Sequence, residues 1–139
     1  MPMLPTRLVL ADFNNDKKLD VATANAGAGT VAIRLGDGQG GFGGNAPFSS
    51  GTAGTNPVGI SAGDFDSDGN MDIVVSNSGG GNFTALTGKG DGTLNAGKNF
   101  TTNAGPSSIV SADYNSDGAL DVVTTSSTTN LAINLNVCQ

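Results

Sequence analysis

The sequence predicts an all-β protein, and three observations support this prediction. All 12 acidic residues are Asp and Glu is absent, whereas the surfaces of helices are usually rich in Glu and Lys. The chain instead combines 22 glycines with Asn, Ser, Thr and Val, a mixture typical of short strands joined by turns. A similar stretch also occurs three times, at 11–25, 63–77 and 112–126, so one structural unit is repeated along the chain.

The three copies are similar beyond the stretch that first reveals them. They read ADFNNDKKLDVATAN, GDFDSDGNMDIVVSN and ADYNSDGALDVVTTS, and they start 52 and then 49 residues apart. A glycine-rich turn, GDGQGGF at 36–42, returns as GKGDGTL at 88–94, again 52 residues later. We therefore expect a single domain, residues 1–139, made of three repeats at about 6–57, 58–106 and 107–139.

Each complete repeat is expected to contain four antiparallel strands. A short apolar segment precedes the aspartate-rich stretch and a β-branched run follows it, and an alternating segment and a weaker fourth strand come later. Four strands in about 50 residues are typical of a β-propeller blade, so the chain is expected to form a partial or half propeller. The expected strands are 8–11, 20–24, 30–36 and 48–50, then 60–63, 72–76, 82–88 and 100–102, and finally 109–112, 121–125 and 130–136.

The aspartate-rich stretch of the second repeat, DFDSDGNMD at 64–72, predicts a metal site. Three carboxylates alternate along the loop and can converge on one point, while a glycine allows a sharp bend. Hard oxygen ligands at this spacing suit calcium, which accepts six to eight of them in flexible geometry, better than magnesium, which demands a tight octahedron. The expected ligands are Asp64, Asp66, Asp68, Asn70 through its backbone carbonyl, and Asp72.

The first and third repeats carry variants of the same loop, so up to three calcium ions are expected per chain. The third loop keeps the glycine, as Gly118, whereas Lys17 replaces it in the first loop. A non-glycine residue is strained in a left-handed backbone, so the first site is expected to be the weakest. The expected ligands are Asp12, Asn14, Asp16, Lys18 through its carbonyl, and Asp20 in the first loop, and Asp113, Asn115, Asp117, Ala119 through its carbonyl, and Asp121 in the third.

Two other interpretations of these loops were weighed. An EF-hand begins with the same spacing, but it needs a Glu at position 12 and a helix on each side. Position 12 is Thr23, Val75 or Thr124, within an expected strand, so this motif is excluded. Solvated turns also use Asp, Asn and Gly, but three such loops in the same place relative to a strand favour metal binding.

These residues resemble the FG-GAP/VCBS repeats of integrin alpha-subunit propellers, fungal lectins and bacterial secreted proteins. The resemblance covers nearly the whole chain and rests on the D-x-[DN]-x-D-G-x-x-D loop between two strands. It implies a β-propeller whose blades bind calcium between their first and second strands, at the residues already given. It leaves the function open, because members of this family include adhesion receptors, lectins and scaffolds.

Several classes of function are excluded or disfavoured by the composition. The formal charge of −6 and the lack of a basic run argue against nucleic-acid binding, and no long apolar stretch predicts membrane insertion. The absence of His and Glu leaves no usual general base, and only Asp37 and Asp91 lie outside the loops, so no enzyme is expected. A single cysteine, Cys138, excludes an intrachain disulfide.

The remaining functions are an adhesion or protein-interaction module with structural calcium, a carbohydrate-binding propeller, or a scaffold piece. Phe13, Phe65 and Tyr114 recur at one position of each loop and are expected to pack between blades rather than against sugars. Trp, the usual platform for sugars, is absent. A glycan ligand therefore has no local support, so adhesion or protein interaction is the expected function and carbohydrate binding is the alternative.

Location and assembly follow from the same features. Calcium sites of this kind fill at the millimolar calcium found outside cells, so an extracellular or secreted protein is expected. Three blades do not make a propeller, which has four to eight, and six is the multiple of three in that range. We therefore expect a homodimer that closes a six-bladed ring, with a fragment of a longer propeller as the alternative.

Overall fold

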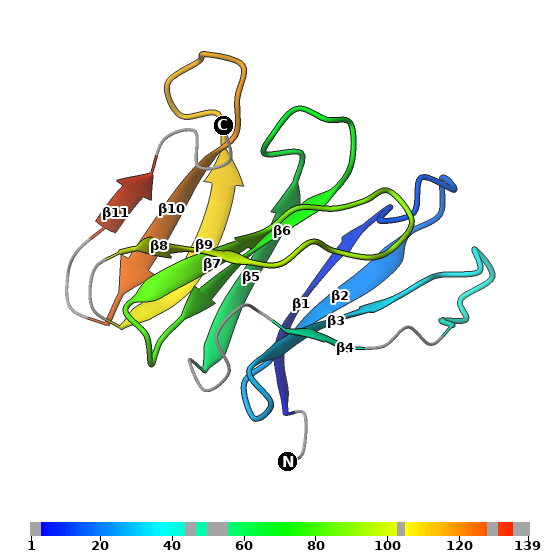
Figure 1. Ribbon diagram of the computed structural model, residues 1–139, viewed down its shortest axis with the longest axis horizontal. Helices are drawn as coiled ribbons and strands as arrows, with labels where there is room; N and C mark the ends of the chain where they lie inside the picture. Colours follow the sequence, from blue (N-terminus) through cyan, green and yellow to red (C-terminus); the bar gives the residue numbers. More distant parts are fainter. Residues whose placement is uncertain (1–3, 44–46, 50–55, 103–104, 128–130, 135–139) are drawn as a thin grey trace.

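The computed structural model describes residues 4–43, 47–49, 56–102, 105–127 and 131–134, and these form an all-β protein (Figure 1). Two sheets of four strands and one sheet of three follow one another along the chain. This confirms the predicted fold class and the three blade-like repeats. The strands are β1 (Pro5–Ala11), β2 (Asp20–Asn25), β3 (Thr30–Arg34), β4 (Pro47–Ser49), β5 (Pro57–Gly63), β6 (Asp72–Asn77), β7 (Asn82–Leu86), β8 (Lys98–Thr101), β9 (Pro106–Ala112), β10 (Asp121–Ser126) and β11 (Leu131–Asn134).

Each sheet is an antiparallel meander in which consecutive strands pair with one another. The orders are β1-β2-β3-β4, β5-β6-β7-β8 and β9-β10-β11. The glycine-rich turns form the bridges Gly36–Phe42 and Gly88–Leu94 between the third and fourth strands, as predicted. No helix that could span a membrane occurs in the described part of the chain.

The first strand of each sheet begins earlier than the sequence predicted. These strands start at Pro5, Pro57 and Pro106 rather than at residues 8, 60 and 109. Proline has no backbone N–H to donate, and it is tolerated at the first residue of a strand. The prolines are spaced 52 and 49 residues apart, as the repeats are, so the sequence held a signal for this boundary.

The connections between sheets differ in length. Residues 50–56 join β4 to β5, whereas residues 102–105 join β8 to β9. These connections contain seven and four residues, and the difference of three accounts for the change in repeat spacing from 52 to 49. Inside the two complete sheets, equivalent residues of the strands and turns are therefore 52 positions apart.

The three sheets lie side by side and bury two apolar layers between them (Figure 1). The first layer joins the first two sheets and contains Phe13, Ile33 and Ile73. The second layer joins the second and third sheets and contains Phe83 and Val122. Successive residues of a strand face opposite sides, so the central sheet contributes Ile73 and Val75 to one layer and Val74 to the other. Among the described residues, the three sheets do not close into a ring.

The recurring aromatic residues follow the prediction in two repeats and depart from it in the third. Phe13 and Phe65 are buried between sheets, as expected. Tyr114 is 48% exposed, because the face of the third sheet on which it lies has no described neighbour. The expectation that Tyr114 packs between blades is therefore wrong for the chain alone.

Candidate metal centre

The three aspartate-rich loops join the first and second strands of each sheet and lie at the same edge of the molecule (Figure 1). Their backbones share two left-handed positions, at which φ is positive. The first of these is Asn15, Ser67 or Ser116, with φ between 60° and 61°. The second is Lys17, Gly69 or Gly118, with φ of 65°, 87° and 88°. Lys17 therefore adopts the left-handed backbone that glycine adopts in the other two loops.

The last aspartate of each loop is buried and acts as an anchor for the loop. Asp72 opens strand β6, and one of its carboxylate oxygens accepts a hydrogen bond of 2.8 Å from the Phe65 N–H. Its other oxygen accepts a hydrogen bond of 2.8 Å from the Gly88 N–H in the turn after β7. Asp20 makes the equivalent pair of bonds in the first sheet. Asp121 is also fully buried and accepts from the Tyr114 N–H at 2.9 Å.

This anchor requires close approach of the turn to the loop, and the glycine at position 88 permits it. A Cβ at Gly88 would overlap the backbone carbonyl of Met71, and Gly36 stands in the same relation to Leu19. We expect Gly88→Ala to lower the free energy of unfolding by about 1–3 kcal/mol, the range for overpacking a filled site. Urea unfolding measures this.

Gly43→Ala is the matched control for Gly88→Ala. A Cβ at Gly43 would meet only the Leu35 carbonyl oxygen at 3.7 Å, an ordinary contact. This control is expected to change the free energy of unfolding by less than about 0.5 kcal/mol, as for an exposed site. Equal losses for the two variants would show that close approach at Gly88 is not required.

The first aspartate of each loop folds the loop upon itself. The two carboxylate oxygens of Asp64 accept hydrogen bonds from the N–H groups of Asp68 and Gly69, at 3.1 and 3.0 Å. Asp12 and Asp113 make the same pair of bonds in their own loops. Local bonds of this kind between an Asp side chain and nearby backbone are typical of tight turns. The three loops therefore have one conformation.

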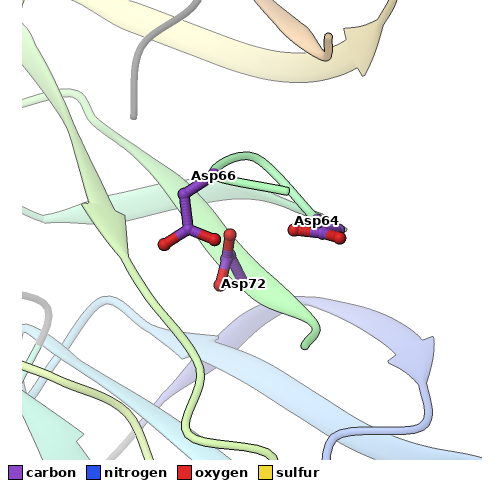
Figure 2. Close-up of side chains that lie close together, drawn as sticks. All are labelled: Asp64, Asp66 and Asp72. Atoms are coloured by element: carbon purple, nitrogen blue, oxygen red, sulfur yellow. The ribbon is translucent and has the colours of Figure 1, made fainter. Parts of the chain in front are cut away.

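In the second loop, three carboxylates converge on one point. Oxygens of Asp64, Asp66 and Asp72 all lie within 4.8 Å of one another. Figure 2 shows Asp66 directed toward Asp72, with Asp64 beside them on the same loop. Calcium binds oxygens at 2.3–2.6 Å, so two oxygens on one ion are at most about 5 Å apart. The three carboxylates are therefore close enough together to share one metal ion.

The electrostatics of the second loop favour a cation. Burial raises the pKa of Asp72 to about 6, although the N–H groups of Gly88 and Phe65 oppose this rise. Burial, together with the charge of Asp68, also raises the pKa of Asp66. Both carboxylates hold their negative charge at a cost, and a bound cation compensates such charge.

The family to which the chain belongs is shown by comparison with known protein families. The profile described as FG-GAP-like repeat matches residues 12–75 and again residues 67–124. These matches cover all three loops and most of the chain. The chain belongs to the FG-GAP-like repeat family. No curated protein matched the chain in a separate search.

The first and third FG-GAP-like loops differ from the second in their acidic residues. Asn14 and Asn115 replace Asp66, so each of these loops has fewer carboxylates. Among the described residues, only the second loop brings three carboxylates together. In the first loop, the Lys18 ammonium also pairs with Asp16 at 3.4 Å. The ligand sets predicted for these two loops stay predictions.

The fourth predicted carboxylate of the second FG-GAP-like loop, that of Asp68, is not one of the three that lie within 4.8 Å of one another. Asp68 accepts hydrogen bonds from the backbone and the side-chain amide of Asn70, at 2.8 and 2.9 Å. These bonds lower the pKa of Asp68. Asp16 and Asp117 likewise accept from the backbone N–H groups of Lys18 and Ala119. All three loops therefore make this backbone hydrogen bond, whether the donor residue is Lys18, Asn70 or Ala119.

A contact between two FG-GAP-like loops was missed by sequence reasoning. The side-chain amide of Asn15 donates a hydrogen bond of 3.0 Å to the side-chain oxygen of Asn70. These residues are 55 positions apart and belong to different repeats. The sequence predicts a role only for the backbone carbonyl of Asn70, and nothing in the repeat pattern pairs its side chain with Asn15.

Proposed function

We propose that the chain is a non-catalytic, calcium-binding FG-GAP-like module for adhesion or protein interaction. The observation that carries this proposal is the convergence of Asp64, Asp66 and Asp72 in a loop built in three copies. Repeats of this family are typically non-catalytic structural modules, which supports the absence of an enzymatic role. Up to three calcium ions would bind, one in each loop.

The position of the carboxylates supports a structural role for calcium. Asp64 and Asp66 lie on the loop, whereas Asp72 belongs to the second strand and is bonded to the turn after the third strand. An ion shared by these three groups would tie the loop, the strand and the turn together. Such an ion stabilises the folded chain, because the unfolded chain has no preformed site.

The choice of calcium is supported by the chemistry of the ligands. All the proposed side-chain ligands are carboxylate or amide oxygens, and backbone carbonyls complete each set. Oxygen donors in a flexible loop suit calcium, whereas magnesium usually keeps several waters and uses fewer protein ligands. A module with such sites would work where calcium is millimolar, so we propose an extracellular or secreted setting.

Calcium titration by calorimetry tests this function directly. We expect the wild-type chain to bind calcium with dissociation constants near 10⁻⁴–10⁻³ M, the range of extracellular modules. Asp66→Ala should lose the second site and should affect binding and stability more than Asn14→Ala, because the second loop has the most carboxylates.

Asp91→Asn is the matched control for this titration. It also removes one negative charge from the second repeat, but Asp91 lies in the turn after β7 and bonds only to Thr93 in the contacts described. Unchanged calcium binding is expected for this variant. Equal losses in Asp66→Ala and Asp91→Asn, which each remove one negative charge, would contradict a site at the loop, and the absence of calcium heat in the wild-type chain would refute the proposed function.

A further inference from the structure

The first and third sheets lie at opposite ends of the row of sheets (Figure 1). Large apolar side chains are exposed on one face of each of these two sheets. Eight of the nine exposed large hydrophobic residues among those described belong to these two faces. The first end face, on the first sheet, consists of Leu8, Leu10, Leu19 and Phe42. The last end face, on the third sheet, consists of Val110, Tyr114, Leu131 and Ile133.

The first end face repeats a surface that is covered in the second sheet. Each residue of the first end face lies 52 positions before a residue of the second sheet that packs against the first sheet. The pairing registers agree, since Leu8 is opposite Thr23 as Ile60 is opposite Val75. The covered equivalents of Leu8, Leu10, Leu19 and Phe42 are Ile60, Ala62, Met71 and Leu94.

The last end face repeats the opposite surface of the second sheet, which is covered by the third. Val110 and Ile133 flank Val123 as Ser61 and Ala85 flank Val74. The equivalents of Val110, Tyr114, Leu131 and Ile133 are Ser61, Phe65, Phe83 and Ala85. Phe65, Phe83 and Ala85 are buried in the layer shared with the third sheet. The two end faces are thus the two halves of one interface, which the chain already forms twice internally.

We propose that the last end face of one copy of the chain docks on the first end face of a second copy, and that two copies close a six-bladed ring. We assign a second copy of the chain as the partner that covers each end face. The two end faces correspond to the two sides of the internal interface, so each face is complementary to the other face and not to itself. Contact between different faces either closes a ring or grows a filament. Six blades fall within the range of closed propellers, and closure covers both end faces of both copies.

The internal interfaces specify the contacts expected between copies. Ser61 and Ser111 are hydrogen-bonded across the second and third sheets, with their hydroxyl oxygens 2.8 Å apart. Ser61 is equivalent to Val110, and Ser111 is equivalent to Ala62 and hence to Leu10. Val110 of one copy is therefore expected to contact Leu10 of the other.

The exposed tyrosine has a matching hollow on the first end face. Phe13 is buried against the second sheet, and its carbonyl accepts a hydrogen bond of 2.9 Å from the Gly92 N–H. The equivalents of these residues are Tyr114 and Gly40. Gly40 lines a hollow of about 380 Å³ together with Leu10, Leu19, Phe42 and neighbouring glycines. We expect the Tyr114 ring of one copy to enter this hollow in the other.

Arg34, beside the first end face, departs from the apolar pattern of the second sheet. Arg34 is exposed at the position that Leu86 occupies in the second sheet, where it is buried. Arginine is enriched at interfaces because its long stem packs while its charged head stays hydrated. An arginine at this position therefore suits a contact between two chains better than a layer buried permanently within one chain.

Light scattering coupled to size exclusion, in saturating calcium, tests the assembly. The expected mass is twice 13.7 kDa for the wild-type chain. Leu10→Asp and Val110→Asp should each reduce it to one copy, since each places a charge in the contact. A wild-type mass of one copy, or of three or more, would overturn the closed pair. The circular dichroism spectrum and unfolding curve of each variant verify that it folds.

Engineered cysteines test which faces meet. In the Cys138→Ser background, Leu10→Cys and Val110→Cys are prepared separately, mixed and oxidised. A disulfide-linked pair is expected from the mixture and from neither variant alone, because the contact joins different faces. Crosslinking of either variant with itself would overturn the proposal, and so would no crosslinking in the mixture. These results do not depend on metal binding by the loops, so they are separate from the calcium titration.

Discussion

Excess chelator is expected to lower the thermal midpoint of unfolding by roughly 10 °C or more, and added calcium should restore it. An ion that binds only the folded chain stabilises it by mass action. At a calcium concentration ten times the dissociation constant, each occupied site contributes about 1.4 kcal/mol. Three such sites would add about 4 kcal/mol to the free energy of unfolding. Differential scanning calorimetry at fixed protein concentration measures the midpoint.

The same scan with magnesium in place of calcium is the control for the identity of the ion. Magnesium should restore less of the midpoint, because the loops offer a flexible set of oxygens rather than a tight octahedron. A midpoint that does not change in excess chelator after exhaustive dialysis would refute structural calcium. Full recovery with magnesium would refute the selectivity.

Asp72→Ala is expected to lower the free energy of unfolding by about 2–6 kcal/mol even in excess chelator. The loss leaves the N–H groups of Phe65 and Gly88 without their acceptor, and each buried unsatisfied donor costs about 1–3 kcal/mol. Chelator removes any contribution from calcium, so the measurement reports these hydrogen bonds less the cost of burying the Asp72 charge. Chemical denaturation monitored by circular dichroism gives the free energy.

Two variants serve as controls for Asp72→Ala. Asp68→Ala removes an exposed carboxylate that bonds only within the loop in the contacts described, and in chelator it should cost less than about 1 kcal/mol. Asp72→Asn keeps one acceptor oxygen and should fall between the two. If Asp68→Ala and Asp72→Ala are equally destabilising in chelator, the anchoring role of Asp72 is wrong.

Most of the fold could be predicted from the sequence because the chain repeats itself. One alternating or β-branched segment is weak evidence, but the same order of segments in three copies fixes the number and order of the strands. The fourth strand was predicted in this way at 48–50; strand β4 is Pro47–Ser49, and residue 50 lies outside the described residues. The division of the chain into repeats at 57/58 and 106/107 stays a prediction.

The candidate site was predictable in its loops and less so in its geometry. The alternation of Asp64, Asp66 and Asp68 predicted that these carboxylates converge, with Asp72 completing the set. The structure brings Asp64, Asp66 and Asp72 together. The orientation of the Asp68 carboxylate was not predictable, because its oxygens accept hydrogen bonds from Asn70, and such local bonds cannot be read from the spacing of the aspartates. Sequence reasoning also failed for the Asn15–Asn70 contact and for Tyr114, since both depend on which sheets are neighbours.

The unequal connections between the sheets affect how the chain can be altered. Segments of seven and four residues join equivalent strands of neighbouring sheets, while the strands and turns inside the two complete sheets keep one register. A loop costs only slowly more entropy as it lengthens, so this junction tolerates insertions that a strand would not. Cutting and splicing at residues 50–56 or 102–105 should therefore allow repeats to be exchanged, added or permuted as whole cassettes.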